Sequence, residues 1–310
     1  MRTRFSIRFL FGLTLVGAVV LCFVHHWYVN PSQQQLVKEL NAYGANPLLS
    51  DGSDLCVLTR LPAGELKVRH LGAPPHLICA GLIFDHVDSS RPLFLASRIT
   101  SATDLRIERV ESNVTPRGCD FSHLQDLSLS GVNTSQLKDW LRAADRLETL
   151  SLVGPQGDSD DILEIVASHP SLSEIRLRNT GVSTKGLRVL SRLSTLHCLV
   201  MFDCPLEQEA LEELVRHQNL RELHLCGEMY GDQTVRSATQ LKQLESLEII
   251  GTSLTDDGVK MICEMPNLYY VNLKYCPRTT SACLPDLIAM KERLQSLGGA
   301  LICDRSIGDD

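Results

Sequence analysis

Two acidic clusters are the first candidates for chemistry in this 310-residue chain. Asp158, Asp160 and Asp161 lie within one helical turn, and Asp256 and Asp257 stand directly before a glycine. Carboxylate oxygens are the ligands that calcium prefers, but a hand-type calcium loop needs further ligands that neither segment supplies. Acidic residues ahead of an apolar run also cap a helix and interact favourably with its dipole. The sequence therefore predicts helix caps here, and no metal site.

Cysteines and histidines are the next reactive side chains. The chain has 11 cysteines but no C-x-x-C pair, so it lacks both a thioredoxin-like motif and the common zinc pattern. Export would permit disulfides, and Cys56 with Cys79 is the pair we single out. His25 and His26 are adjacent but have no further ligands nearby, which favours polar residues at a membrane interface over a metal site. No cofactor is predicted.

Known catalytic motifs are missing from the chain. It has no G-x-S-x-G, H-E-x-x-H, P-loop or dinucleotide-binding glycine pattern. The net charge is −7, and no basic block follows the N-terminal segment, so a nucleic-acid surface is not predicted. The sequence favours a protein that is not an enzyme. A hydrolase whose residues come together only in the fold is retained as a minor alternative.

A short sequence repeat organises the chain and must position any functional group. L-x-x-L-x-L-type segments start at equal intervals, at Leu172, Leu196, Leu220, Leu244 and Leu268. This motif, recurring with a constant period of this length, predicts leucine-rich repeats. Weaker or degenerate copies are predicted to start at Ala102, Leu124, Leu147 and Leu294.

Short amphipathic segments separate the predicted strands. Residues 186–193, 210–214 and 258–262 carry apolar side chains every three or four positions, which predicts helices. One strand and one helix per unit can bury their leucines only against neighbouring copies. The fold class predicted is therefore α/β, a leucine-rich repeat solenoid with a concave parallel sheet and short convex helices.

The ninth position of each repeat is predicted to satisfy backbone groups in the turn after the strand. Small residues with a hydrogen-bonding atom occupy it in four units: Thr180, Cys204, Thr252 and Cys276. Three other units depart from this preference: Val132, Pro155 and Glu228. Cys263 follows Ile262 on a predicted helix and is expected to be a small core residue.

The unit from Leu244 to Leu268 resembles leucine-rich repeats of the ribonuclease-inhibitor and cysteine-containing type. Its turn, Leu254-Thr-Asp-Asp-Gly-Val259, is similar to turns in membrane-anchored planctomycete-type bacterial leucine-rich repeat proteins. The N-terminal Arg4-Phe-Ser-Ile-Arg8 resembles the start of their anchors. The resemblance covers roughly residues 99–300 and implies partner binding without an assigned activity.

The N-terminal part of the chain predicts a membrane anchor. Residues 1–8 form a basic segment with three arginines, and residues 9–28 form a single transmembrane helix with Trp27 and Tyr28 at its interface. The arginines place the N-terminus in the cytoplasm and the repeats outside; a cleaved secretory signal is the alternative. Residues 29–98, with a short helix at 33–45, are assigned to a juxtamembrane linker and N-terminal cap. Residues 99–310 are assigned to the repeat domain and its C-terminal cap.

The concave sheet is where a partner is expected to bind. Strand alternation turns the third, fifth and seventh position of each repeat outward. The predicted partner-binding residues are Glu174, Arg176, Arg178, Val200, Phe202, Glu222, His224, Glu248, Ile250, Tyr270, Asn272 and Lys274. Cys198, Cys226 and Ser246 complete the face, and Val200, Phe202, Cys226 and Ile250 are predicted to form its exposed apolar centre.

These residues predict a membrane-anchored, non-catalytic module that binds a protein or peptide. An apolar centre with a charged rim is typical of protein-binding surfaces. A structural, envelope-organising protein without a discrete ligand is the alternative.

Overall fold

The computed structural model describes residues 78–99, 102–206, 210–217 and 219–303, together with Glu39, Ala42 and the short strands between residues 45 and 67. The predicted basic segment 1–8, the anchor 9–28 and most of the predicted helix 33–45 lie outside the described residues. Within the described part, no helix has the length and apolar character needed to cross a bilayer.

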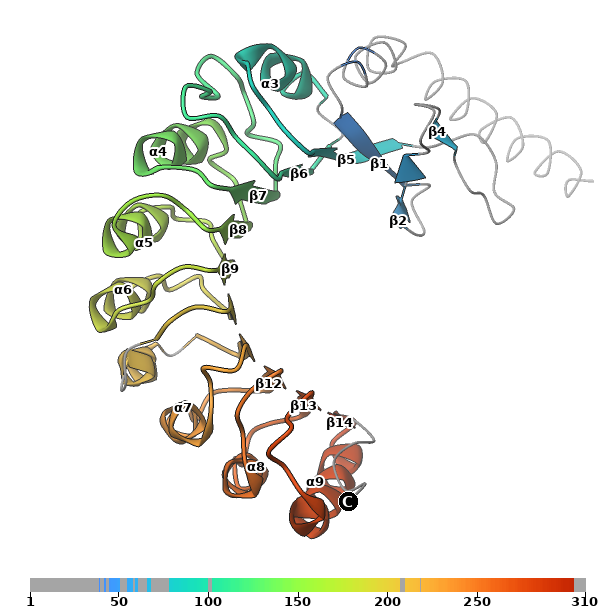
Figure 1. The fold of residues 1–310 in the computed structure, drawn as a ribbon, viewed down its shortest axis with the longest axis vertical. Coiled ribbons are helices and arrows are strands. Elements are labelled where there is room, and N and C mark those ends of the chain that lie inside the picture. The colour runs from blue at the N-terminus through green and yellow to red at the C-terminus, as the bar shows by residue number, and fades with distance from the viewer. Residues whose placement is uncertain are drawn as a thin grey trace, which may run out of the picture.

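A sheet of twelve strands lines the inner side of an open arc (Figure 1). Ten of its strands are parallel and follow one another in chain order. They are β5 (Ile78–Phe84), β6 (Asp104–Ile107), β7 (Asp126–Ser130), β8 (Thr149–Val153), β9 (Glu174–Arg178), β10 (Cys198–Phe202), β11 (Glu222–Cys226), β12 (Ser246–Ile250), β13 (Tyr270–Lys274) and β14 (Ala300–Cys303).

Short helices lie on the outer side of the arc, after every strand from β5 to β13 except β6, which a loop follows (Figure 1). They are α3 (Ser90–Ala96), α4 (Thr134–Ala143), α5 (Ser159–Ala167), α6 (Thr184–Leu190), the 3-10 helix η1 (Ala210–Arg216), α7 (Asp232–Ala238), α8 (Asp256–Cys263), and the pair η2 (Ser281–Cys283) and α9 (Leu284–Ser296). Each buries the apolar side of its periodic pattern, as α8 does with Val259 and Ile262. This is a leucine-rich repeat solenoid.

The core is a continuous leucine-rich layer between the sheet and the helices. The leading leucines of the repeats, Leu172, Leu196 and Leu220, are fully buried. The sheet pairs Ile175 with Leu199 and continues in the same register along the arc, so each repeat packs its apolar side chains on the same positions of its neighbours. Burying one such side chain stabilises the fold by about 1.5–3 kcal/mol. A lone repeat has no neighbouring repeat against which to bury it.

The N-terminal edge of the parallel sheet is covered by antiparallel strands. β1 (Ala45–Ser50) pairs with β5, and β2 (Leu55–Val57) pairs with β1; β3 (Thr59–Arg60) and β4 (Leu66–Lys67) form a separate pair. This arrangement matches the need to shield an open sheet edge. The parallel sheet begins at Ile78, within the segment 29–98 assigned to linker and cap, because β5 pairs as a repeat strand without the L-x-x-L-x-L pattern.

The C-terminal end differs from the prediction that a last unit starts at Leu294. Leu294 lies in α9 and is buried with Leu287 and Met290, so these three residues form the apolar side of a helix. The last strand is β14, in which Leu301 pairs with Val271. The prediction was wrong because leucines at helical spacing also fit part of the repeat pattern.

The strand register argues against a disulfide between Cys56 and Cys79. Leu49 of β1 pairs with Cys56 on one side and with Cys79 on the other. Two strand spacings of about 4.8 Å therefore separate the two cysteine Cα atoms, roughly 10 Å in all. A disulfide requires Cα atoms no more than about 7 Å apart. This arrangement of strands does not permit the predicted bond.

Candidate functional site on the concave sheet

The predicted partner-binding residues lie in three columns that cross the strands. The register between β9 and β13 aligns the third, fifth and seventh positions of successive repeats. The columns are Glu174, Cys198, Glu222, Ser246 and Tyr270; Arg176, Val200, His224, Glu248 and Asn272; and Arg178, Phe202, Cys226, Ile250 and Lys274.

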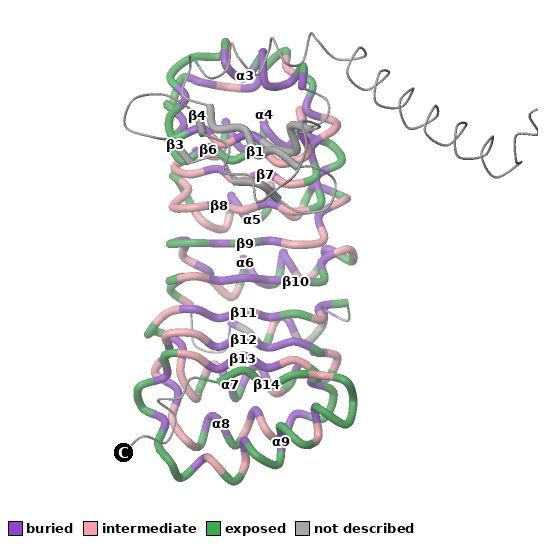
Figure 2. Tube along the Cα trace, turned by 90° about the vertical axis from the view of Figure 1, so that its right-hand side faces the viewer, coloured by how far each residue is buried: buried purple, intermediate pink, exposed green. Residues whose placement is uncertain are grey.

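The centre of this face is more enclosed than the sequence predicts. Val200 is 4% exposed and Cys226 5%, whereas Phe202 and Ile250 are half-buried. On the concave side of an arc, side chains of adjacent strands converge, and Val200 lies between the longer Arg176 and His224 in its column. The exposed apolar centre was therefore wrong for Val200 and Cys226. Figure 2 shows the strands from β10 to β13 largely buried.

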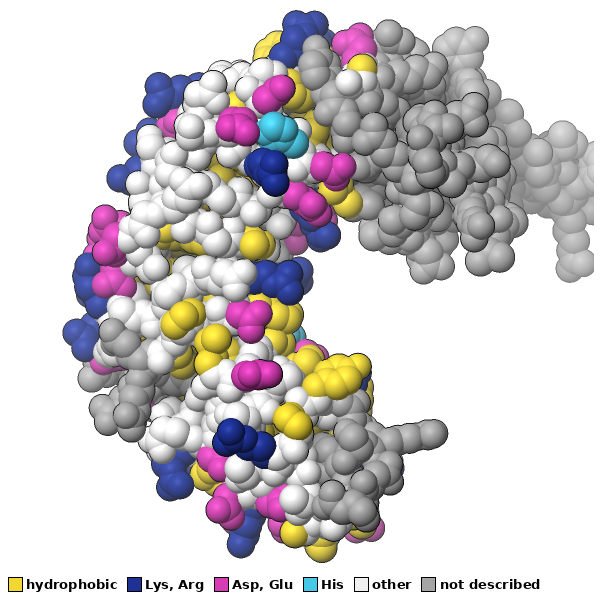
Figure 3. Space-filling view, viewed as in Figure 1, with side chains coloured by type: hydrophobic (Ala, Val, Ile, Leu, Met, Phe, Trp, Pro, Cys, Tyr) yellow, Lys and Arg dark blue, Asp and Glu magenta, His cyan; other side chains and the backbone are white. Residues whose placement is uncertain are grey.

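Arginine and aromatic side chains mark the surface at β9 and β10. The Arg178 guanidinium carbon lies 5.1 Å from the centre of the Phe202 ring, within the range of a cation–π interaction. Arg176 Nε donates to Glu174 Oε1 at 2.6 Å. Figure 3 shows hydrophobic side chains beside the inner edge at the middle of the arc, next to charged side chains. This part of the face offers an aromatic ring and two positioned guanidinium groups.

A shallow hollow of about 240 Å³ extends from this surface along β6 to β10. Its lining includes Asp104, Arg106 and Asp126, together with Arg178 and Phe202. Burial and the neighbouring Asp126 carboxylate raise the pKa of Asp104. The predicted set contains none of the first three residues because it begins at β9. Applying the outward positions to the weaker repeats at Ala102 and Leu124 would have found them.

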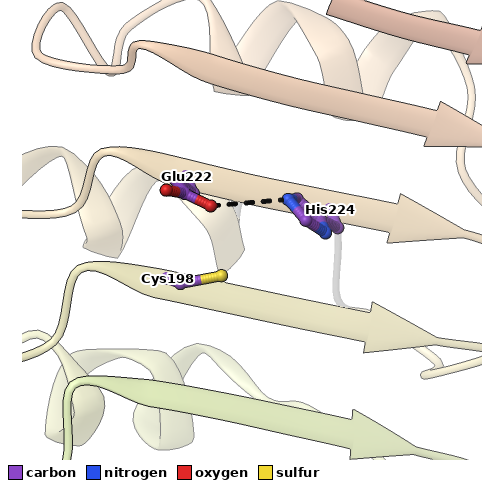
Figure 4. Close-up of side chains that lie close together, drawn as sticks. All are labelled: Cys198, Glu222 and His224. Atoms are coloured by element: carbon purple, nitrogen blue, oxygen red, sulfur yellow. Dashed lines mark ion pairs between the residues drawn. The ribbon is translucent and has the colours of Figure 1, made fainter. Parts of the chain in front are cut away.

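Cys198, Glu222 and His224 meet at the centre of the face (Figure 4). Cys198 comes from β10, and the other two come from alternate positions of β11. One donor atom from each side chain lies within 4.8 Å of the other two. His224 Nε2 is 3.9 Å from Glu222 Oε2, and His224 Nδ1 is 3.7 Å from Glu248 Oε2. The sequence grouped these residues as a partner-binding surface and did not predict a metal cluster.

The electrostatic surroundings of the Cys198–Glu222–His224 cluster are acidic. Burial raises the pKa of the Cys198 thiol, and the carboxylates of Glu174 and Glu222 raise it further. Beyond the cluster, burial and the neighbouring Glu248 raise the pKa of Tyr270. Carboxylates thus stand on several neighbouring strands around the thiol.

The acidic clusters make hydrogen bonds at the start of a helix and between repeats. Asp158 accepts hydrogen bonds from the backbone N–H groups of Asp160 and Asp161 and caps α5, as predicted. Asp256 instead reaches the next repeat, where it accepts from the Thr280 N–H at 2.7 Å and from its hydroxyl at 2.6 Å.

Asp232 makes the same pair of contacts with the N–H and hydroxyl of Thr255. Thr255 is the N-cap residue of α8, but its side chain makes no capping bond there. The carboxylates of Asp232 and Asp256 are thus occupied by hydrogen bonds that couple adjacent repeats.

Thr180, Cys204 and Cys276 contact backbone carbonyls from the ninth position, as predicted. The Cys204 thiol donates to the carbonyls of Leu177 and Phe202, and the Cys276 thiol contacts those of Ile249 and Lys274.

The repeat with Glu228 at the ninth position makes a different contact with the neighbouring turn. Glu228 is exposed, while the buried Tyr230 hydroxyl donates to the Cys204 carbonyl at 2.9 Å. Cys263 is partly buried against the core.

Comparisons with known proteins identify no family for this chain. No protein-family model matches the chain, and no curated protein matches it. Solved structures similar to it include a protein of Bacteroides fragilis, with 17% identity, a TM-score of 0.45, and coverage of 68% of this chain and 67% of that one.

An internalin of Listeria monocytogenes is also similar, with 17% identity and a TM-score of 0.35. The match covers 58% of this chain and 57% of the internalin. Both TM-scores are low, so the assignment as a leucine-rich repeat solenoid rests on the strands, helices and register described above. Neither neighbour is a planctomycete protein, and the resemblance to planctomycete-type proteins stays a prediction.

Proposed function

We propose that this protein is a membrane-anchored, non-catalytic module that binds a protein or peptide on its concave sheet. The observation that supports it most directly is the surface formed by Arg178 and Phe202, which opens into the hollow along β6 to β10. Arginine and aromatic side chains in a pocket are the residues that contribute most to binding in protein interfaces. Tyr270 and Lys274 extend the binding surface over β13.

The use of the polar residues supports the proposed non-catalytic role. In the described part of the chain, Asp158, Asp232 and Asp256 are engaged in caps and in contacts between repeats. The charged residues of the hollow come in mixed signs, with Asp104 and Asp126 beside Arg106. This arrangement suits a partner that presents both basic and acidic groups.

The anchor and its orientation belong to the proposal as well. Residues 9–28 have the length and composition of a transmembrane helix, with Arg2, Arg4 and Arg8 on the cytoplasmic side. This places the repeats outside the cytoplasm. We expect an added protease to digest them once the outer envelope is opened while the inner membrane remains intact. Digestion only after the inner membrane is broken would reverse this orientation.

The binding surface can be tested by photo-crosslinking in native membranes. A photoreactive amino acid replaces Phe202 on the concave side in one variant and Phe94, which is 49% exposed on α3, in a matched control. We expect a specific adduct from position 202 only, and its loss when Arg178→Ala is added. Equal adducts from both positions would refute binding by the concave sheet, and adducts with copies of the same chain would support the structural alternative.

A further inference from the structure

We propose that Cys198, Glu222 and His224 bind a divalent transition-metal ion, best suited to Zn²⁺, and that Glu248 orients the histidine. This inference goes beyond partner binding and does not depend on it. It rests on the convergence of a sulfur, a nitrogen and an oxygen donor on one spot of the sheet (Figure 4).

The fold brings the three donors to the same face without strain. Glu222 and His224 alternate on β11, so both point to the concave side, and Cys198 is the register partner of Glu222 on β10. Zinc binds sulfur, nitrogen and oxygen at about 2.0–2.3 Å, so two ligands of a tetrahedral site lie roughly 3.3–3.8 Å apart. The three donor atoms already lie within 4.8 Å of one another. Small side-chain rotations would therefore complete the coordination.

The donor types select the class of metal. Calcium and magnesium prefer oxygen ligands, whereas a thiolate and an imidazole together favour zinc and similar transition metals. Three protein ligands leave a fourth position of a tetrahedral ion open toward the concave surface, where water or a ligand oxygen would bind.

The surroundings of His224 match those of a metal-bound histidine. Its Nε2 faces Glu222, and its Nδ1 faces the Glu248 carboxylate at 3.7 Å on the other side. A carboxylate behind the second ring nitrogen is the usual way to fix the orientation of a metal-ligating histidine.

The contacts of His224 are ion-pair contacts without a direct hydrogen bond (Figure 4). His86 Nε2 lies 2.8 Å from Glu111 Oε1, a direct hydrogen bond on the exposed surface. The two carboxylates beside His224 stay at 3.7 and 3.9 Å, beyond hydrogen-bond distance. The carboxylate of Glu174 is a third one near the cluster. Arg176 donates to Glu174 and brings a positive charge close to Cys198. The carboxylates of Glu174 and Glu222 thus lie near the thiol, and that of Glu248 lies beside the imidazole.

Metal binding replaces one proton. The Cys198 thiol loses its proton to solvent as sulfur coordinates the ion, while a carboxylate oxygen and an imidazole nitrogen bind through lone pairs. No redox step is involved.

The test uses the full chain in detergent and measures bound metal after dialysis against Zn²⁺, followed by the spectrum of the Co²⁺ form. We expect one metal ion more per chain in the wild type than in Cys198→Ser, His224→Gln or Glu222→Gln, and a cobalt–thiolate absorption band that Cys198→Ser abolishes. Glu222 is exposed, so Glu222→Gln removes a ligand without disturbing the core. Circular dichroism checks that each variant is folded.

Matched controls come from neighbouring residues. Cys226→Ser alters a buried cysteine on the same face, and His197→Gln alters an exposed histidine before β10. Both are expected to keep the metal and the cobalt band. Equal metal content in wild type and Cys198→Ser, or a cobalt band that survives Cys198→Ser, would overturn the proposal. Glu248→Gln is expected to weaken Zn²⁺ affinity about 10–100-fold, and unchanged affinity would overturn its orienting role.

Discussion

Replacing His217 by leucine tests how the repeats are joined behind the sheet. The ring is 2% exposed and bridges two repeats. Its Nδ1 accepts a hydrogen bond from the Leu220 N–H at 2.9 Å, and its Nε2 donates to the Leu193 carbonyl at 2.6 Å. Leucine has a similar bulk but no polar atom, so His217→Leu removes both bonds and leaves the packing largely filled.

The expected loss of stability depends on which hydrogen bonds the two backbone partners of His217 keep. The Leu193 carbonyl still accepts from the Leu196 N–H at 3.1 Å, so losing the histidine costs it only a net hydrogen bond, about 0.5–1.5 kcal/mol. The Leu220 N–H loses the bond that the ring supplied, which costs about 1–3 kcal/mol in the core. The total is roughly 1.5–4.5 kcal/mol. The lower value applies if the Leu220 N–H turns to the His217 carbonyl, as Leu196 does with Leu193.

Urea unfolding followed by circular dichroism measures the change, with hydrogen exchange of the Leu220 amide as the local readout. His197→Leu is the matched control, because His197 belongs to the same repeat as His217 and is exposed. We expect a lower free energy of unfolding and faster Leu220 exchange in His217→Leu alone. A change within about 0.5 kcal/mol of the control, the usual range for surface substitutions, would refute the bridging role.

Three further predictions concern pH, a buried hydroxyl and a close backbone contact. Burial lowers the pKa of His217 below 6.5, so the unfolded chain binds the proton first; urea midpoints should fall as pH drops below about 6.5, and less so in His217→Leu. Tyr230→Phe should cost about 1–3 kcal/mol in urea unfolding by leaving the Cys204 carbonyl unpaired, while the exposed Tyr269→Phe should cost little. Gly299→Ala would place a methyl group against the Tyr269 backbone, so hydrogen exchange across β14 should accelerate, unlike in Gly181→Ala.

The sequence was sufficient to predict the sheet because the repeat spacing is also the register. Leucines that occupy the same position in successive repeats pair as neighbours, and strand alternation then decides which side chains face the concave side. It was insufficient at the ends. Leu294 fits part of the repeat pattern, yet with Leu287 and Met290 it has the spacing of a helix, and only packing decides between the two.

The sequence predicts which residues lie at the candidate site, but not how deeply they are buried or that three of them could bind a metal ion. Alternation places Val200 on the concave side but does not tell how closely Arg176 and His224 approach it. The sequence did not indicate the proposed metal cluster, because recognisable metal-binding motifs place their ligands at short spacings. Cys198 lies one full repeat before Glu222, and His224 follows Glu222 by two residues on the same strand. Donors at these spacings come together only where successive repeats form adjacent strands.

The regularity of the sheet explains how a site can be built from several repeats. From β7 to β13 every strand has the same length and pairs without a shift, while the outer elements vary from the 3-10 helix η1 to the longer α9. The strands of Cys198 and Glu222 flank η1 in the chain and keep the common register. Side chains on adjacent strands are therefore held at a fixed spacing of about 4.8 Å, whatever the outer segments do. The concave face can thus exchange residues to suit a ligand while the fold is maintained by the leucines beneath it.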